Sequence, residues 1–104
     1  MFVTSQGSAH GRFQRAVLRR NVLLAETAAG ELGRLSLIDA LSLVALYAAT
    51  GSSKFEAAGV RWLGRLALEG RDVGIGDLQL AAAALGRLKG RRREQAERTL
   101  LELL

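Results

Sequence analysis

The chain has 104 residues and a formal net charge of +5, with 49% hydrophobic and 24% charged residues. Because this hydrophobic fraction is ample for a packed core, the composition argues against a disordered chain and indicates a single domain. The sequence has no cysteine, which excludes disulfides, thiolate nucleophiles and cysteine-bound metals. Leu and Ala dominate the apolar residues and proline is absent, so the sequence predicts an all-α fold.

Residues 1–11 combine Ser, Gly, Gln, Thr and a single His, with little apolar periodicity. We expect this segment to form a flexible N-terminal tail. Helical spacing begins at Arg12, and residues 12–104 are expected to form a single helical domain. The first helix is short, from Arg12 to about Arg20, and its apolar residues share one face.

The next two helices carry their own start and stop signals. Asn21 is a suitable N-cap for the second helix, and Gly33 suits the position just beyond its end. Ser36 is suited to cap the third helix, and Asp39 follows it at the spacing of a capping box. Between residues 37 and 49 the third helix is apolar nearly all round, which predicts a buried central helix.

Three further helices follow. The fourth, in FEAAGVRWLGRLALEG, is amphipathic and is expected to be capped by Ser52 or Ser53. A glycine-rich turn separates it from a fifth helix, predicted from about Asp77 to Leu88. The sixth occupies the chain after Gly90. Together these patterns predict a compact array of about six helices in three antiparallel hairpins.

A faint internal repeat underlies the last four helices. A shift of 38 residues aligns LSLIDALSLVALYA with VGIGDLQLAAAALG, and FEAAGVRWLGRL with REQAERTLLELL. Two-helix units of about 34 to 47 residues are typical of α-solenoids. Since amphipathic helices in series match one another at some offset by chance, two arrangements stay open, a bundle of hairpins and an α-solenoid-like repeat.

The inventory of reactive side chains is thin. The only histidine, His10, lies in the expected tail, and the carboxylates are dispersed along the chain. Gly74 and Gly76 follow a predicted helix rather than a strand, which is the wrong context for a dinucleotide-binding loop. We therefore expect no catalytic residue, no metal or cofactor site and no small-molecule substrate, and the sequence does not predict an enzyme.

Positive charge concentrates in two clusters, residues 12–20 and residues 87–93, which hold nine of the fifteen Lys and Arg residues. The helix dipole favours arginine in the last turn of a helix, whereas arginine in the first turn gains from a bound anion. The candidate contacts for phosphate or nucleic acid are Arg12, Arg15, Arg19, Arg20, Arg91, Arg92 and Arg93.

The placement of the two basic clusters stays open at the level of sequence. In an open solenoid they would lie near opposite ends, whereas in a compact bundle they could be neighbours. A solvated corner between two helices, without a ligand, would also explain the second cluster. Which of these holds depends on how the hairpins pack.

The C-terminal LLELL segment suggests another use of the surface. Leu100, Leu101 and Leu104 form a candidate association face, because exposed leucines at a chain end favour self-association. The predicted function is a non-catalytic helical protein–protein interaction module or small adaptor, with a homodimer as one form. The alternative is a small basic nucleic-acid-associated or DNA-binding protein that uses the two arginine clusters.

The sequence also bears on location. The chain opens without the charged and apolar regions of a secretion signal. The longest apolar run, residues 43–49, is far shorter than the roughly 20 residues of a membrane span. We expect a cytoplasmic protein without a membrane partner.

Overall fold

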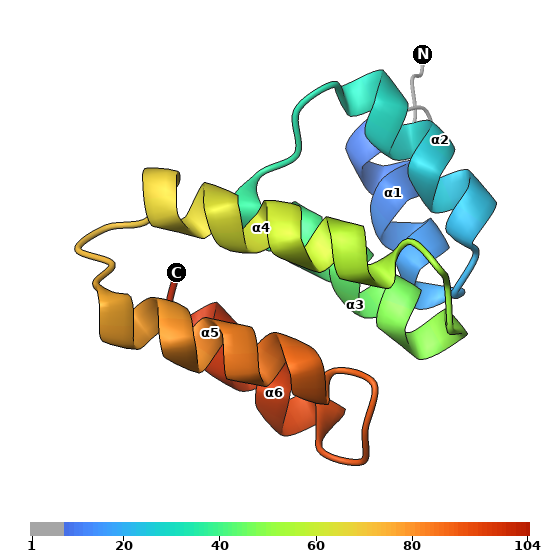
Figure 1. The fold of residues 1–104 in the computed structure, drawn as a ribbon. Coiled ribbons are helices and arrows are strands. Elements are labelled where there is room, and N and C mark those ends of the chain that lie inside the picture. Colours follow the sequence, from blue (N-terminus) through green and yellow to red (C-terminus); the bar gives the residue numbers. More distant parts are fainter. Residues whose placement is uncertain (1–7) are drawn as a thin grey trace.

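The structure is a computed structural model, and it describes residues 8–104 (Figure 1). Within these residues the chain forms helices and no strand, as the composition predicts. The helices are α1 (Ala9–Leu18), α2 (Val22–Leu32), α3 (Leu37–Thr50), α4 (Phe55–Glu69), α5 (Ile75–Arg87) and α6 (Arg93–Glu102).

Consecutive helices pack as three hairpins, α1–α2, α3–α4 and α5–α6, with α3–α4 in the middle (Figure 1). Short turns join the two helices of each pair, so the two run antiparallel. The structure measures 49 × 29 × 21 Å along its principal axes, as expected of stacked hairpins rather than of a sphere. This confirms the predicted all-α array of three antiparallel hairpins.

Local hydrogen bonds explain where the helices around α2 begin and end. The Asn21 side chain accepts a hydrogen bond from the backbone N–H of Leu24 at 3.1 Å, and α2 starts directly after Asn21. Gly33 adopts a φ of +79°, which glycine tolerates best. Ser36 Oγ accepts a hydrogen bond from the N–H of Asp39 at 3.1 Å. These contacts confirm the three predicted capping positions.

The first helix is longer than the sequence predicts. It begins at Ala9, because the Ser8 side chain accepts a hydrogen bond from the N–H of Gly11 at 2.9 Å and caps the helix. Residues 9–11 are therefore helical, and their prediction as part of a flexible tail is wrong. Of the rest of that predicted tail, Ser8 is the N-cap of α1, and residues 1–7 lie outside the described residues.

The start of α5 and the cap of α4 differ from their predictions. α5 begins at Ile75 rather than at Asp77, and the Asp77 carboxylate accepts a hydrogen bond from the N–H of Gly74 at 2.9 Å. Neither predicted serine caps α4: the residue before the helix is Lys54, which makes no side-chain cap bond. Ser52 Oγ instead accepts a hydrogen bond from the N–H of Lys54 at 3.1 Å, within the turn.

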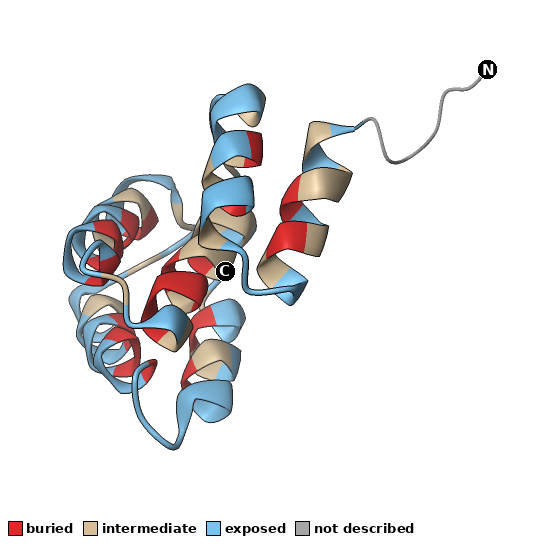
Figure 2. Cartoon of the chain, turned by 90° about the vertical axis from the view of Figure 1, so that its right-hand side faces the viewer, coloured by how far each residue is buried: buried red, intermediate tan, exposed pale blue. Residues whose placement is uncertain are grey.

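α3 joins the two parts of the hydrophobic core. On one side, its Leu46 packs with Phe13 of α1 and Ala25 of α2. On the other side, Leu41 and its neighbours pack with Trp62 of α4 and with residues of α5 and α6. Figure 2 shows that the buried residues line the helix sides that face one another. α3 is thus central, as its apolar sequence predicts, but it is only partly buried, because Ile38 is 55% exposed.

The starts of the last four helices follow the 38-residue shift found in the sequence. The shift carries the first residue of α3 onto the first residue of α5, and the first residue of α4 onto that of α6. Core positions follow it too, because Tyr47 corresponds to Leu85 and Trp62 to Leu100, and all four are buried. The second and third hairpins therefore share helix starts and these core positions, as an α-solenoid-like repeat predicts.

Candidate functional site

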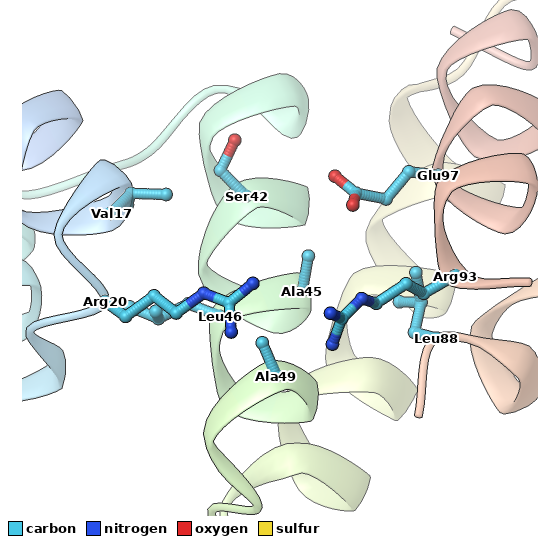
Figure 3. A pocket seen from close by; sticks show the side chains of 9 residues that line it. All are labelled: Val17, Arg20, Ser42, Ala45, Leu46, Ala49, Leu88, Arg93 and Glu97. Atoms are coloured by element: carbon cyan, nitrogen blue, oxygen red, sulfur yellow. The ribbon is translucent and has the colours of Figure 1, made fainter. Parts of the chain in front are cut away.

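The structure brings one arginine from each basic cluster into the same groove. Arg20 lies in the turn after α1, and Arg93 is the first residue of α6. Both side chains line a groove over α3, and their guanidinium groups point toward each other across it (Figure 3). The two clusters therefore meet at these two residues.

The backbone at the end of α1 places Arg20. The N–H of Arg20 donates to the carbonyl of Val17 at 3.0 Å, and the N–H of Asn21 donates to the carbonyl of Ala16 at 2.9 Å, a Schellman pattern. Arg20 has a φ of +57°, a left-handed conformation that glycine and asparagine adopt more readily. An arginine here costs backbone strain, and strain of this kind is concentrated at functional positions.

The start of α6 adds to the positive potential of the groove. Arg92, the N-cap residue, makes no side-chain cap bond, so it leaves the first N–H groups of the helix without that partner. The positive end of the helix dipole lies at the same place, next to Arg93. Glu94 in the first turn offsets part of this potential. A bound anion would therefore be attracted by Arg93 and by the helix end together.

Small side chains of α3 form the floor of the groove. Ala45 and Ala49 leave room above the helix because each side chain is a single methyl group. The cavity has a volume of about 150 Å³. Sites for drug-sized ligands measure roughly 300 to 1,000 Å³, so this groove is sized for a small anion or for one unit of a longer ligand. The remaining lining residues are Val17, Ser42, Leu46, Leu88 and Glu97.

Neither groove arginine takes part in an ion pair within residues 8–104. Outside the clusters, three basic residues do: Arg34 and Arg65 both pair with Glu69, and Lys54 pairs with Glu26. In the described part of the chain, six exposed cluster arginines take part in no ion pair. They are Arg19, Arg20, Arg87, Arg91, Arg92 and Arg93. Their charges are open to an anionic ligand.

The other predicted contacts do not join this groove. Arg12, Arg15 and Arg19 line a separate groove between α1 and α2, where Arg12 forms an ion pair with Glu31. Arg91 and Arg92 precede α6 in an exposed turn and do not line the groove of Arg20 either. The structure thus brings together two of the predicted contacts.

Ser42 and Glu97 line the groove but are not among the predicted contacts. Each has a signal in the sequence. Ser42 is one of two strongly polar residues in the apolar third helix, and Glu97 follows Arg93 by one helical turn. These signals show that each side chain is unusual in its own helix, but they do not indicate that α3 and α6 place both side chains at one groove.

The predicted association face is wrong at Leu100. This residue is fully buried, because one face of α6 packs Ala96 and Leu100 into the core shared with α3, α4 and α5. Leu101 and Leu104 lie on the outside and are 47% and 38% exposed. Only these two of the three predicted leucines are available to a partner of the folded chain.

His10 belongs to α1 and contacts a second element. Its Nε2 atom lies 3.0 Å from Oδ2 of Asp39, and this contact ties the start of α1 to the start of α3. Across residues 8–104, no three His, Asp and Glu side chains gather closely enough to hold a metal ion. The helices in this range also lack the combination of length and apolar character that a bilayer span requires.

Comparison of the chain with protein-family models, with curated proteins and with solved structures found no match. A function is therefore inferred from the geometry and charge of the groove.

Proposed function

We propose that this protein binds the phosphate backbone of nucleic acid through the groove between α1, α3 and α6, and that it acts in the cytoplasm without catalysis. The observation that carries this proposal is the convergence of Arg20 and Arg93. These residues come from two clusters at opposite ends of the chain, yet their guanidinium groups face each other over α3 (Figure 3).

The chemistry of the two side chains suits phosphate. Arginine presents several N–H donors in a planar fork, which matches the oxygens of a phosphate group better than a lysine does. Both guanidinium groups are in an exposed groove and neither is engaged by a carboxylate within residues 8–104. A phosphate between them would also lie near the positive end of α6.

Binding of a labelled oligonucleotide, followed by fluorescence anisotropy at two salt concentrations, tests the proposal. We expect affinity to fall between about 50 mM and about 200 mM salt, because each phosphate contact releases counterions. The double variant Arg20→Gln/Arg93→Gln should bind about tenfold more weakly or worse at low salt. Its affinity should also depend less steeply on salt, because the contact of both arginines with their phosphate is lost.

The matched control is Arg71→Gln/Arg98→Gln, which removes the same charge from exposed positions outside both clusters. It should retain most of the affinity and the salt slope of the wild type. Absence of any binding by the wild type at low salt would refute the proposal. Equal weakening by the two double variants would show that net charge, rather than the groove, attracts the oligonucleotide.

A second function, association with a protein, is favoured by the exposed apolar side chains. Leu101 and Leu104 lie near each other at the C-terminal end of the chain and are 47% and 38% exposed, and exposed apolar side chains of this kind are typical of protein contacts. For a homodimer through α6, the double variant Leu101→Ser/Leu104→Ser should raise the dimer dissociation constant about tenfold or more. Light scattering after gel filtration measures this, and a monomeric wild type at high concentration would contradict it.

A further inference from the structure

The groove is not uniformly basic. Arg20 and Arg93 occupy one end, and Ser42 and Glu97 line the other end (Figure 3). Ser42 Oγ donates its hydrogen to the carbonyl of Ile38 at 3.3 Å, so its oxygen is left as an acceptor. The Glu97 carboxylate can only accept, and it takes part in no hydrogen bond or ion pair within the described residues.

This arrangement restricts the ligand. A carboxylate near a phosphate site lowers the affinity for a bare anion, because the two negative charges repel each other. The cost is offset when the ligand carries a hydrogen-bond donor close to its phosphate, since that donor can bond to Glu97 or to the Ser42 oxygen. The groove therefore fits a ligand with an anionic group at one end and a donor at the other.

In nucleic acids, the ribose 2′-hydroxyl is a donor of this kind, and it is the group by which proteins distinguish RNA from DNA. We infer that the groove selects single-stranded RNA, with one phosphate between Arg20 and Arg93 and the neighbouring 2′-hydroxyl donating to Glu97 or Ser42. The volume of about 150 Å³ suits one sugar–phosphate unit of a flexible strand. This inference rests on the proposed function.

The test compares three labelled single strands of one sequence: RNA, DNA, and RNA with 2′-O-methyl groups. The DNA strand carries uracil in place of thymine, so that the three strands differ only at the 2′ position. The full chain should bind RNA about tenfold more tightly than DNA, because the donor is present only in RNA. The 2′-O-methyl strand should bind like DNA, since it has lost the donor. A 2′-O-methyl strand that binds as tightly as RNA would overturn the inference.

Two substitutions connect the preference for RNA to the groove. The double variant Glu97→Ala/Ser42→Ala should reduce this preference to about twofold or less. Binding of DNA should stay constant or strengthen, because the repulsion from the carboxylate is gone. Glu102→Ala, which removes an exposed carboxylate from the same helix, is the matched control and should keep the preference. Circular dichroism verifies that each variant is folded.

The outcomes separate this inference from the proposed function. Equal binding of RNA and DNA that still depends on Arg20 and Arg93 would overturn the inference and leave the proposed function in place. A preference for RNA that survives in the double variant Glu97→Ala/Ser42→Ala would also overturn the inference. Absence of binding to every strand would remove the proposed function and this inference with it.

Discussion

Tyr47 takes part in a polar contact between α2, α3 and the turn before α4. It is buried, and its hydroxyl donates to Oε2 of Glu26 at 2.6 Å. Lys54 Nζ donates to the same oxygen at 2.7 Å. Burial raises the pKa of Tyr47 to about 12, and the hydrogen bond to Glu26 adds to this effect. The contact thus ties α2 to α3 and to the residue that precedes α4.

Replacement of this hydroxyl should weaken the fold. Tyr47→Phe keeps the ring in the core but removes the donor to a charged carboxylate, so the free energy of unfolding should fall by about 1 to 2 kcal/mol. Urea unfolding at neutral pH measures the change. In a Glu26→Gln background the same replacement should cost less, since the charged acceptor is already absent. An equal cost in both backgrounds would show that the two side chains are not coupled.

The same contact makes stability depend on pH. Hydrogen bonds from Lys54 and then from Tyr47 hold the pKa of Glu26 below its ordinary value of 4.5. As the pH falls, the unfolded chain takes up the proton first, so this stabilisation is complete above pH 4.5 and is lost as the pH falls through the lower folded-state pKa. The urea midpoint should therefore drop more steeply below pH 4.5 in the wild type than in Glu26→Gln. Parallel curves would contradict this.

Caps could be predicted from the sequence because their hydrogen bonds are local. Asn21 and Ser36 each bond to an N–H three residues further along the chain, and such spacing is visible in the sequence. The partner of Tyr47 lies 21 residues away on another helix. No local pattern indicates that contact, because it depends on how the hairpins pack.

At the scale of elements, the connection between α4 and α5 depends on Gly70. The N–H of Gly70 donates to the carbonyl of Leu66 at 2.9 Å, and the chain then turns tightly. A Cβ atom at Gly70 would lie 2.4 Å from Val73 Cγ2 and 2.6 Å from the Leu66 carbonyl oxygen. Both distances are shorter than van der Waals contact, so this position requires glycine for space.

Gly70→Ala should therefore destabilise the protein by about 1 to 3 kcal/mol, because the turn must shift to relieve the overlap. Gly64→Ala is the matched control, since Gly64 lies inside α4 and a Cβ there meets no atom within 4 Å. The control should raise stability by about 0.5 to 1 kcal/mol through helix propensity. Thermal unfolding compares the two, and a Gly70→Ala variant as stable as the wild type would refute the assigned role of the glycine.

The 38-residue shift relates the helices of the second and third hairpins. It could be predicted from the sequence because it follows helical periodicity, and the helix starts agree with it. The start of α5 was predicted less well. Its first turn contains Ile75 and Gly76, which carry no clear start signal, and Asp77 bonds back to the N–H of Gly74.

At the scale of the whole molecule, adjacent leucines of α6 have opposite environments. Leu100 is fully buried among residues of four helices, whereas Leu101 is 47% exposed. The two residues have the same chemistry and are neighbours in the chain. Their difference arises from the direction in which the α5–α6 hairpin packs against α3 and α4.

Substitution of these two leucines should distinguish a core position from a surface position by its effect on stability. Leu100→Ala leaves a cavity in the shared core and should lower the free energy of unfolding by about 2 to 5 kcal/mol. Leu101→Ala should change it by less than about 0.5 kcal/mol in a monomer, because its side chain already meets solvent. Urea unfolding at low protein concentration measures both. Comparable losses in the two variants would contradict the placement of α6.

The helical class, the approximate helices and most caps follow from interactions between residues within a few positions of one another, so the amino-acid order specifies them. The placement of Arg20 opposite Arg93 does not follow from such local interactions. These residues are far apart in the chain, and they face each other only because α1 and α6 pack on opposite sides of the small-residue face of α3. Burial of apolar surface between hairpins determines that packing, and the charges follow the helices that carry them.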